Sequence, residues 1–274
     1  MTDLDFSGKH VVVTGAATGV GAALLDVLAE LGHPDVTVLD VKEPSGPRHT
    51  YLQTDLGDRA AVDAAVARID RPVDALFNNA GVADTLPAAT VFSVNVLAPV
   101  HLTAALMPRL AEGGAIANTA SIAGLNWRHH LREILELLAL DGWDEMLAWF
   151  EDRDLDIDTY SFTKEVVQVW TMRAAAHLGK QGVRINSVCP SPIDTPLLGD
   201  FRTTLGDAGI DFTIANAGGR LVTAREVALV LAWLASPAAP FVSGQNLNVD
   251  AGFEGAMITR QLDTSAVRRD PPRS

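Results

Sequence analysis

The sequence predicts an α/β fold, with a doubly wound sheet of seven parallel strands and helices on both faces. Two observations support this prediction. Short apolar runs alternate with longer helical patterns, and the runs are continuously apolar, as expected of strands buried on both faces. The 274 residues contain no internal repeat and no linker between domains. We therefore expect one domain over residues 1–264, followed by a charged tail over 265–274.

The first part of the chain alternates between strand and helix from its start. Each expected strand is a β-branched or apolar run, and each expected helix is rich in alanine or leucine at helical spacing. The elements are a strand at 10–13, a helix at 22–31 closed by Gly32, strands at 36–39 and 51–53, a helix at 58–69, a strand at 73–77, a helix at 90–110 and a strand at 115–118. Pro99 lies inside the third helix and predicts a kink there.

The second part of the chain continues the alternation. We expect a helix at 159–178, a strand at 183–188, a helix at 224–234 and a strand at 245–249. Each strand follows a helix long enough to cross back over the sheet, which is the pattern of parallel pairing.

Segment 127–156 interrupts this pattern with two amphipathic helical repeats separated by Gly142. Apolar residues recur at helical spacing in two groups: Leu131, Ile134, Leu135 and Leu138, then Trp143, Met146, Leu147 and Phe150. This predicts a helical hairpin. It could form a pocket wall or lid, or it could be an oligomer interface or a surface elaboration, because amphipathic periodicity alone indicates only packing.

The composition excludes several classes of function. Acidic residues outnumber lysine and arginine by 34 to 21, a net charge of −13, which disfavours nucleic acid and anionic membranes. Neither a signal peptide nor an apolar run of about 18 residues is evident, so no membrane span is expected. The single cysteine, Cys189, suits a cytoplasmic protein and reads as a packed thiol. No metal site is expected, because His129 and His130 are adjacent and would point apart on a helix.

A glycine-rich turn, Thr14 to Gly21, directly follows the first strand and opens a helix. Glycines there let the backbone approach a pyrophosphate, and the helix N-terminus supplies free N–H donors, as in the Rossmann dinucleotide fold. Asp40 ends the second strand, 19 residues after Gly21. A carboxylate at this place binds the ribose 2′-hydroxyl and repels a 2′-phosphate, so it predicts NAD rather than NADP, although Lys42 could soften that repulsion.

Tyr160 and Lys164 are separated by four residues on a predicted helix. Their side chains therefore lie on one helix face and can act on the same substrate. An ammonium beside a phenol should lower the pKa of the phenol and make it a proton-transfer group near neutral pH. Beside a dinucleotide site, this pair predicts hydride-transfer chemistry.

These motifs, together with Asn78-Asn79-Ala80-Gly81, Asn95 and Ser121, resemble the short-chain dehydrogenase/reductase family in identity and order over nearly the whole chain. The insertion is similar to that of a subgroup with bacterial 3α-hydroxysteroid dehydrogenase/carbonyl reductase and coniferyl-alcohol dehydrogenase. The sequence departs from the family pattern at Pro190-Ser191, where Pro-Gly is usual, and at Ala98, where glycine is common. Residues Ser121 and Tyr160 are also 39 apart, much farther than usual.

The resemblance implies catalytic roles for Asn95, Ser121, Tyr160 and Lys164. Tyr160 would be the acid/base, Lys164 would bind the nicotinamide ribose, Ser121 would bind the substrate oxygen, and Asn95 would hold a water that relays the proton. The implied cofactor site consists of Gly15, Thr18, Gly19, Val20, Gly21, Asp40, Val41, Asp55, Leu56, Asn79, Ala80, Gly81, Tyr160, Lys164, Pro190, Ile193 and Thr195.

The substrate is expected to be a bulky apolar alcohol, steroid-like or aromatic, or its ketone or aldehyde. In the family, the segment after the sixth strand selects the substrate, and here residues 196–217 should form a lid with Leu197, Leu198, Phe201, Phe212 and Ile214. Trp127, Trp143 and Trp149 would enlarge an apolar pocket, unless they are ordinary core residues. The resemblance also implies a homodimer or homotetramer. Two alternatives are a nucleotide-sensing binding protein and an NAD-using lyase or epimerase on the same fold.

Overall fold

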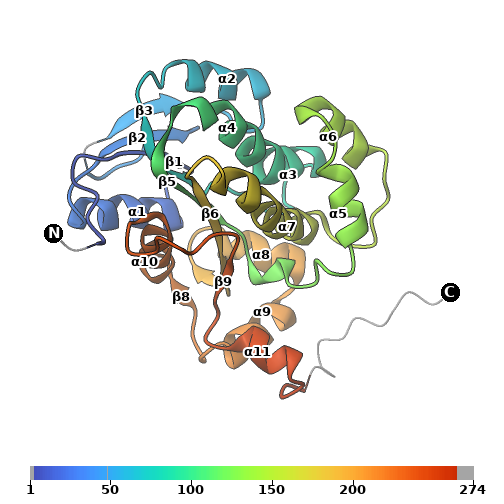
Figure 1. Ribbon diagram of the computed structural model, residues 1–274. Coiled ribbons are helices and arrows are strands. Elements are labelled where there is room, and N and C mark those ends of the chain that lie inside the picture. Colours follow the sequence, from blue (N-terminus) through green and yellow to red (C-terminus); the bar gives the residue numbers. More distant parts are fainter. Residues whose placement is uncertain (1–2, 48, 264–274) are drawn as a thin grey trace.

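A computed structural model describes residues 3–47 and 49–263, so the tail expected at 265–274 lies outside the described residues. Its main sheet has seven strands in the order β3-β2-β1-β4-β5-β6-β9, all paired in parallel (Figure 1). The strands are β1 His10–Thr14, β2 Asp35–Asp40, β3 Thr50–Gln53, β4 Val73–Asn78, β5 Leu110–Thr119, β6 Arg184–Pro190 and β9 Asn246–Val249. The predicted seven-stranded parallel sheet is confirmed.

Helices cover both faces of this sheet (Figure 1). One face packs against α1 (Gly19–Glu30) and α10 (Ala224–Ala235), and the other against α2 (Arg59–Ala67), α4 (Ala98–Leu106) and α7 (Thr159–Gly179). The alternation of side chains along β1 shows this directly. Val11 and Val13 belong to the apolar cluster of the first face, whereas Val12 belongs to that of the second.

The helix expected at 90–110 is interrupted rather than simply kinked. It begins as α3 (Ala88–Phe92), widens into a π-helical turn (Ser93–Leu97), continues as α4 and ends in a 3₁₀ turn (Met107–Arg109). Pro99 has no N–H, so the Asn95 carbonyl lacks its usual α-helical donor. Residues 88–109 are long and apolar enough to cross a membrane, but 61% of their most apolar window is buried. Packing in the core therefore accounts for their hydropathy.

The insertion forms the predicted helical hairpin, α5 (Leu131–Leu137) and α6 (Gly142–Glu151), beside α3 and α7 (Figure 1). Its aromatic residues pack inward. Phe150 stacks on Phe92 with ring centroids 4.2 Å apart, and Trp149 stacks on Phe162 of α7 at 6.4 Å. Trp143 and Trp149 are buried in the same apolar cluster. Of the two interpretations of these tryptophans, core packing is the one that the structure supports.

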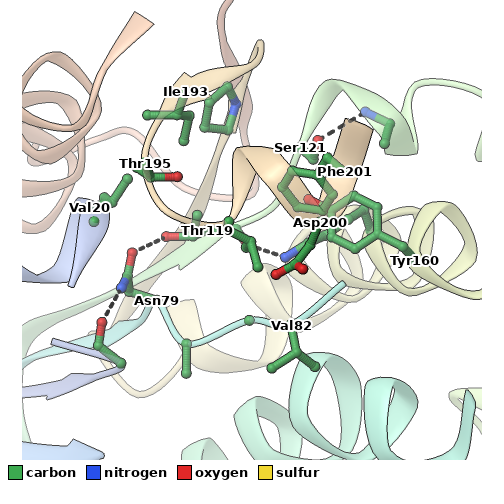
Figure 2. A pocket seen from close by; sticks show the side chains of 18 of the residues that line it. Val20, Asn79, Val82, Thr119, Ser121, Tyr160, Ile193, Thr195, Asp200 and Phe201 are labelled. Carbon is green, nitrogen blue, oxygen red and sulfur yellow. Dashed lines mark hydrogen bonds between the residues drawn. The ribbon is translucent and has the colours of Figure 1, made fainter. Parts of the chain in front are cut away.

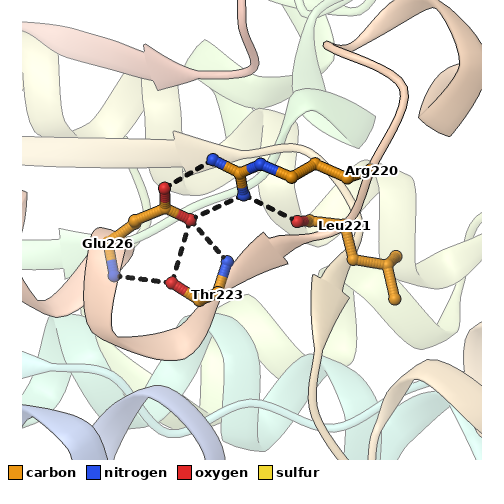
Figure 3. A network of polar contacts seen from close by, with 4 residues as sticks. All are labelled: Arg220, Leu221, Thr223 and Glu226. Carbon is orange, nitrogen blue, oxygen red and sulfur yellow. Dashed lines mark hydrogen bonds and ion pairs between the residues drawn. The ribbon is translucent and has the colours of Figure 1, made fainter.

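The expected lid is a helical excursion that leaves and re-enters the fold at one place. It contains α8 (Leu198–Leu205) and α9 (Asp207–Asn216), and the short parallel strands β7 (Ile193–Asp194) and β8 (Val222–Thr223) pair at its base. Glu226 closes a capping box with Thr223 at the start of α10 and binds Arg220 through both carboxylate oxygens (Figure 3). The Arg220 and Thr223 contacts lower the pKa of Glu226 to about 2. This network fixes the chain where it returns from the lid.

Candidate active site

A cleft of about 1050 Å³ opens at the carboxyl ends of β1, β2, β4 and β5. Strand order reverses between β1 and β4, and doubly wound folds bind ligands at such a reversal. The cleft is larger than the roughly 300–1,000 Å³ typical of one small-molecule site, which fits a cofactor together with a substrate. It is lined by every residue predicted for the cofactor except Gly21, and by Ser121, Tyr160 and Lys164; Asn95 does not line it (Figure 2).

The glycine-rich turn makes a cradle that only glycine fits. Gly15 has φ +68°, and a Cβ there would lie 2.5 Å from the Ala80 Cα. Gly21 does not line the cleft, and its predicted part in cofactor binding stays a prediction. A Cβ on Gly21 would overlap the Gly15 carbonyl oxygen and lie 2.7 Å from the Asn79 side-chain nitrogen. It therefore acts indirectly, by letting α1 pack against the turn that faces the ligand.

The N-terminus of α1 is left open for an anion. Its N-cap residue, Thr18, makes no side-chain capping bond, whereas Asp58, Asp158 and Thr223 cap α2, α7 and α10. The first N–H groups of α1 therefore have no side-chain acceptor from Thr18, and the helix dipole favours negative charge there. These features fit the pyrophosphate of a dinucleotide.

Asp40 is 8% exposed at the end of β2, facing the glycine turn. Its carboxylate accepts hydrogen bonds from the N–H groups of Ala17, at 2.9 Å, and Lys42, at 3.0 Å. Val41, Asp55 and Leu56 line the same end of the cleft. This end therefore has both the acidic group and the apolar walls expected around an adenosine.

Three candidate catalytic side chains meet at the other end. Tyr160 and Lys164 project from the first turns of α7, and Ser121 lies two residues beyond the end of β5. The Lys164 Nζ donates to the Thr119 carbonyl at 2.9 Å and lies 5.5 Å from the centre of the Tyr160 ring. The Ser121 hydroxyl accepts a hydrogen bond from the Ala123 N–H at 3.1 Å, which leaves its own hydrogen to donate to the Tyr160 oxygen or to a substrate.

The prediction that Lys164 lowers the pKa of Tyr160 is wrong for this structure. Burial raises the pKa of Tyr160; a hydrogen bond with Ser121 opposes this, and the carboxylates of Asp158 and Asp84 add to it. Burial also lowers the pKa of Lys164 to about 8. Spacing on the helix indicated only that the two groups are neighbours, whereas the loss of water from both dominates their protonation.

Comparison with known proteins identifies the family to which this chain belongs. A family model described as short chain dehydrogenase matches residues 9–132, and one described as enoyl-(acyl carrier protein) reductase matches residues 155–254. Coniferyl-alcohol dehydrogenase of Pseudomonas sp. (strain HR199 / DSM 7063) is 32% identical, over 93% of this chain and 100% of that protein. The chain belongs to the short-chain dehydrogenase/reductase family.

Two further relatives support the subgroup and the cofactor. The 3-alpha-hydroxysteroid dehydrogenase/carbonyl reductase of Comamonas testosteroni is 29% identical, over 92% of this chain and 99% of that protein. The solved 3-alpha-hydroxysteroid dehydrogenase of Pseudomonas sp. B-0831, complexed with NADH, aligns with a TM-score of 0.77 at 28% identity, over 93% of this chain and 100% of that chain. With the glycine cradle, this supports a short-chain oxidoreductase with a nicotinamide dinucleotide cofactor, NAD or NADP.

Asn95 sits differently from the other three motif residues of this short-chain dehydrogenase/reductase. It is buried in the π-helical turn, and its side chain bonds the Val82 N–H and carbonyl at 2.9 and 3.0 Å and the Thr163 hydroxyl at 3.2 Å. The side chain thus holds the loop after β4. A water-holding role would fall to the Asn95 carbonyl, which Pro99 leaves without its usual donor, and it stays a prediction.

Other residues hold Ser121, Tyr160 and Lys164 in place, and no sequence motif predicted them. The Gln168 side chain donates to the Ser121 carbonyl at 2.8 Å, and a Cβ on Gly124 would lie 2.6 Å from the Lys164 backbone, so the Ser121 turn packs directly on α7. Asp84 accepts from the Tyr160 N–H at 3.0 Å. These contacts join segments whose separation along the chain carries no periodic signal.

The substrate end of the cleft is closed by the lid and not by the insertion. Leu197 and Phe201 line it as predicted, and the Phe201 ring lies 4.6 Å from that of Tyr160. Ile210 and Phe253 also line it and were not predicted, while Leu198, Phe212 and Ile214 do not. No residue of 127–156 lines this cleft, so the insertion is not a wall of the candidate active site.

The insertion instead contacts the back of α7. His130, which immediately precedes α5, makes a 2.7 Å hydrogen bond to Glu165, the residue after Lys164. Burial raises the pKa of Glu165 to about 7. The insertion therefore buttresses the helix that carries the catalytic pair.

Proposed function

We propose that this short-chain oxidoreductase uses NAD to interconvert a bulky, apolar alcohol and its ketone or aldehyde. The observation that supports this most is the convergence of Tyr160, Ser121 and Lys164 in one cleft with the glycine cradle. The lid lines the cleft near Tyr160 with apolar side chains and one carboxylate, Asp200, and offers no basic side chain there, which favours a large apolar substrate over a phosphorylated one.

The chemistry divides between the cofactor and the chain. When bound, the dinucleotide would supply the hydride chemistry, taking a hydride from the alcohol in oxidation or giving one to the carbonyl in reduction. Ser121 donates a hydrogen bond to the reacting oxygen, and Tyr160 takes the hydroxyl proton in oxidation or gives one in reduction. Lys164, beside the phenol, keeps a cation near the site of proton transfer. Phe201 over Tyr160 excludes water from the reacting groups.

The preference for NAD rests on Asp40. Replacing Asp40 with alanine should narrow the ratio of kcat/KM for NAD over NADP by about tenfold or more, because a hydrogen bond to a charged group contributes roughly 1.5–3 kcal/mol. Asp40 also holds the N–H groups of Ala17 and Lys42. Asp40→Asn removes the charge but keeps one of the two acceptor oxygens, so it disturbs the loop less than alanine does. If the ratio of kcat/KM for NAD over NADP were unchanged in both variants, Asp40 would not determine the choice of cofactor.

The function itself is tested by an NADH-forming screen over steroid, terpene and aromatic alcohols. We expect turnover with secondary or allylic alcohols that carry a large apolar body, and none with phosphorylated alcohols. Product formed without net NADH would instead indicate a lyase or epimerase. Binding of NAD without any turnover, with the biological effect intact in Tyr160→Phe, would indicate a nucleotide sensor.

Assembly and location are also proposals. The family resemblance favours a homodimer or homotetramer, which light scattering on the purified protein tests. The lone, buried Cys189 favours the cytoplasm, which fractionation of expressing cells tests.

A further inference from the structure

Asp200 places a carboxylate in the substrate end of the cleft, with no partner among the residues that the structure describes. It lies in the first turn of α8 in the lid, and Figure 2 shows its side chain turned into the pocket near Tyr160 and Phe201. Within residues 3–47 and 49–263, no hydrogen bond or ion pair reaches its carboxylate oxygens, whereas its main-chain carbonyl accepts a hydrogen bond from the Thr204 hydroxyl at 3.1 Å.

Nearby acids of the lid are treated differently. Arg202, two residues farther along α8, binds Asp207 and Asp211 at 2.8 Å each. The lid thus pairs its outward carboxylates with an arginine and leaves the inward one unpaired. A carboxylate only accepts hydrogen bonds, so its partner has to be a donor that arrives with a ligand.

The surroundings of Asp200 narrow the choice of ligand. The charged residues that line the described cleft are Asp40, Lys42, Asp55, Lys164 and Asp200. The first three stand at the adenosine end, and Lys164 is bonded to Thr119. The same cleft is also lined by the apolar side chains of Leu86, Leu197, Phe201, Leu205, Ile210 and Phe253, and by the uncharged polar side chains of Thr90, Asn126, Ser161 and Thr213. A ligand that fits this place has an apolar body and one hydrogen-bond donor away from its reacting carbon.

We propose that Asp200 is a specificity-determining residue that binds a second hydroxyl or phenol of the alcohol substrate and repels substrates that carry a carboxylate. The inference rests on the proposed alcohol dehydrogenase function and names its substrate class: diols and hydroxylated aromatic alcohols. Charge-assisted O–H···O⁻ bonds are short and strong, and a site built around one rejects an analogue that lacks the donor.

Matched substrates test this proposal. p-Coumaryl and cinnamyl alcohol differ only in the para hydroxyl, and phenylethanediol and phenylpropanol have nearly the same shape but differ in the second hydroxyl. We expect the wild-type protein to favour the donor-bearing member of at least one pair about tenfold or more in kcat/KM. Asp200→Ala should abolish the preference, and Asp200→Asn should raise kcat/KM for p-carboxycinnamyl alcohol.

Asp194→Asn is the control, because Asp194 is exposed and does not line the cleft. Equal kcat/KM within both pairs in the wild-type protein would overturn the proposal. So would an Asp200→Ala variant that loses activity equally on all substrates or binds NADH more weakly, since Asp200 would then serve the cofactor or the lid.

Equilibrium binding separates this inference from the proposed function. Calorimetric titration of each pair into the protein–NADH complex reports the preference without turnover. Preferential binding without turnover would support Asp200 as the recognition residue and overturn the alcohol dehydrogenase activity. Turnover without any preference would support the alcohol dehydrogenase activity and overturn Asp200 as the recognition residue. Absence of both turnover and preferential binding would overturn both proposals.

Discussion

Replacing Tyr160 with phenylalanine should lower kcat by about 10²–10⁴-fold, the usual contribution of general acid–base catalysis, and leave the dissociation constant of NAD nearly unchanged. The substitution removes one oxygen atom from a ring that is 7% exposed and packed against Phe201. The apolar ring remains, so the packing of α7 and the lid is kept. The proton, however, has no other acceptor at the same place.

Tyr51→Phe is the matched control, because the chain contains only two tyrosines and Tyr51 lies on β3 outside the cleft lining. Stopped-flow or steady-state NADH formation measures kcat, and fluorescence titration measures NAD binding. Full turnover in Tyr160→Phe would remove this proton-transfer mechanism. A loss equal to that in Tyr51→Phe would point to folding instead.

The pH dependence of activity should also show that Tyr160 transfers the proton. Burial raises the pKa of Tyr160 above its ordinary value, so the phenol is protonated at neutral pH and ready to act as an acid. Carbonyl reduction should therefore be insensitive to pH near neutrality. Alcohol oxidation requires the phenolate, so its kcat/KM should rise as pH increases from neutral. Tyr160→Phe should flatten that rise. Ser121→Ala should shift it to higher pH, because the Ser121 hydrogen bond lowers the pKa of Tyr160.

The framework of this site could be predicted from the sequence because it follows from strand ends. Parallel strands buried on both faces are continuous apolar runs, and their carboxyl ends meet at one edge. Residues just after those runs, such as Gly15, Asp40, Asn79 and Ser121, had to converge there. Boundaries were less accurate. Helix α1 begins at Gly19 rather than at 22, because the glycine turn already provides its first turn.

Contacts between side chains of distant segments could not be predicted in this way. Asp84 bonds the Tyr160 N–H across 76 residues, and Gln168 bonds Ser121 across 47. No sequence periodicity or motif marks either pair, because the two contacts form only when α7 packs on the loops after β4 and β5. The predicted lowering of the Tyr160 pKa was wrong for the same reason, since the structure raises this pKa. The pKa of Tyr160 depends on the burial of its ring, which packs against Phe201. The four-residue spacing between Tyr160 and Lys164 carries no information about that burial.

Gly21→Ala should weaken dinucleotide binding severely although Gly21 does not touch the cleft. Alanine is favoured over glycine inside a helix by roughly 1 kcal/mol, so propensity alone predicts a more stable α1. Packing opposes this. The new methyl group would overlap the Gly15 carbonyl oxygen and lie 2.8 Å from the Ala16 Cα. Both are backbone atoms of the phosphate cradle, and they can give way only if α1 moves off the turn.

Because overpacking typically costs about 1–3 kcal/mol, the clash should match or exceed the helical gain, and the displaced cradle should raise the dissociation constant of NAD by about tenfold to 100-fold. Gly179→Ala supplies the contrast. Gly179 ends α7 with nothing within 4 Å of an added Cβ, so alanine there should leave binding unchanged and stability equal or slightly higher.

Thermal unfolding of both variants with and without NADH makes the comparison. Wild type and Gly179→Ala should gain the same stabilisation from the ligand, whereas Gly21→Ala should gain much less. If Gly21→Ala bound NAD as tightly as wild type, the approach of α1 to the turn would not be what shapes the cradle. In that case the start of α1 would tolerate a shift that should disturb the Gly15 carbonyl and the Asn79 side chain bonded to it.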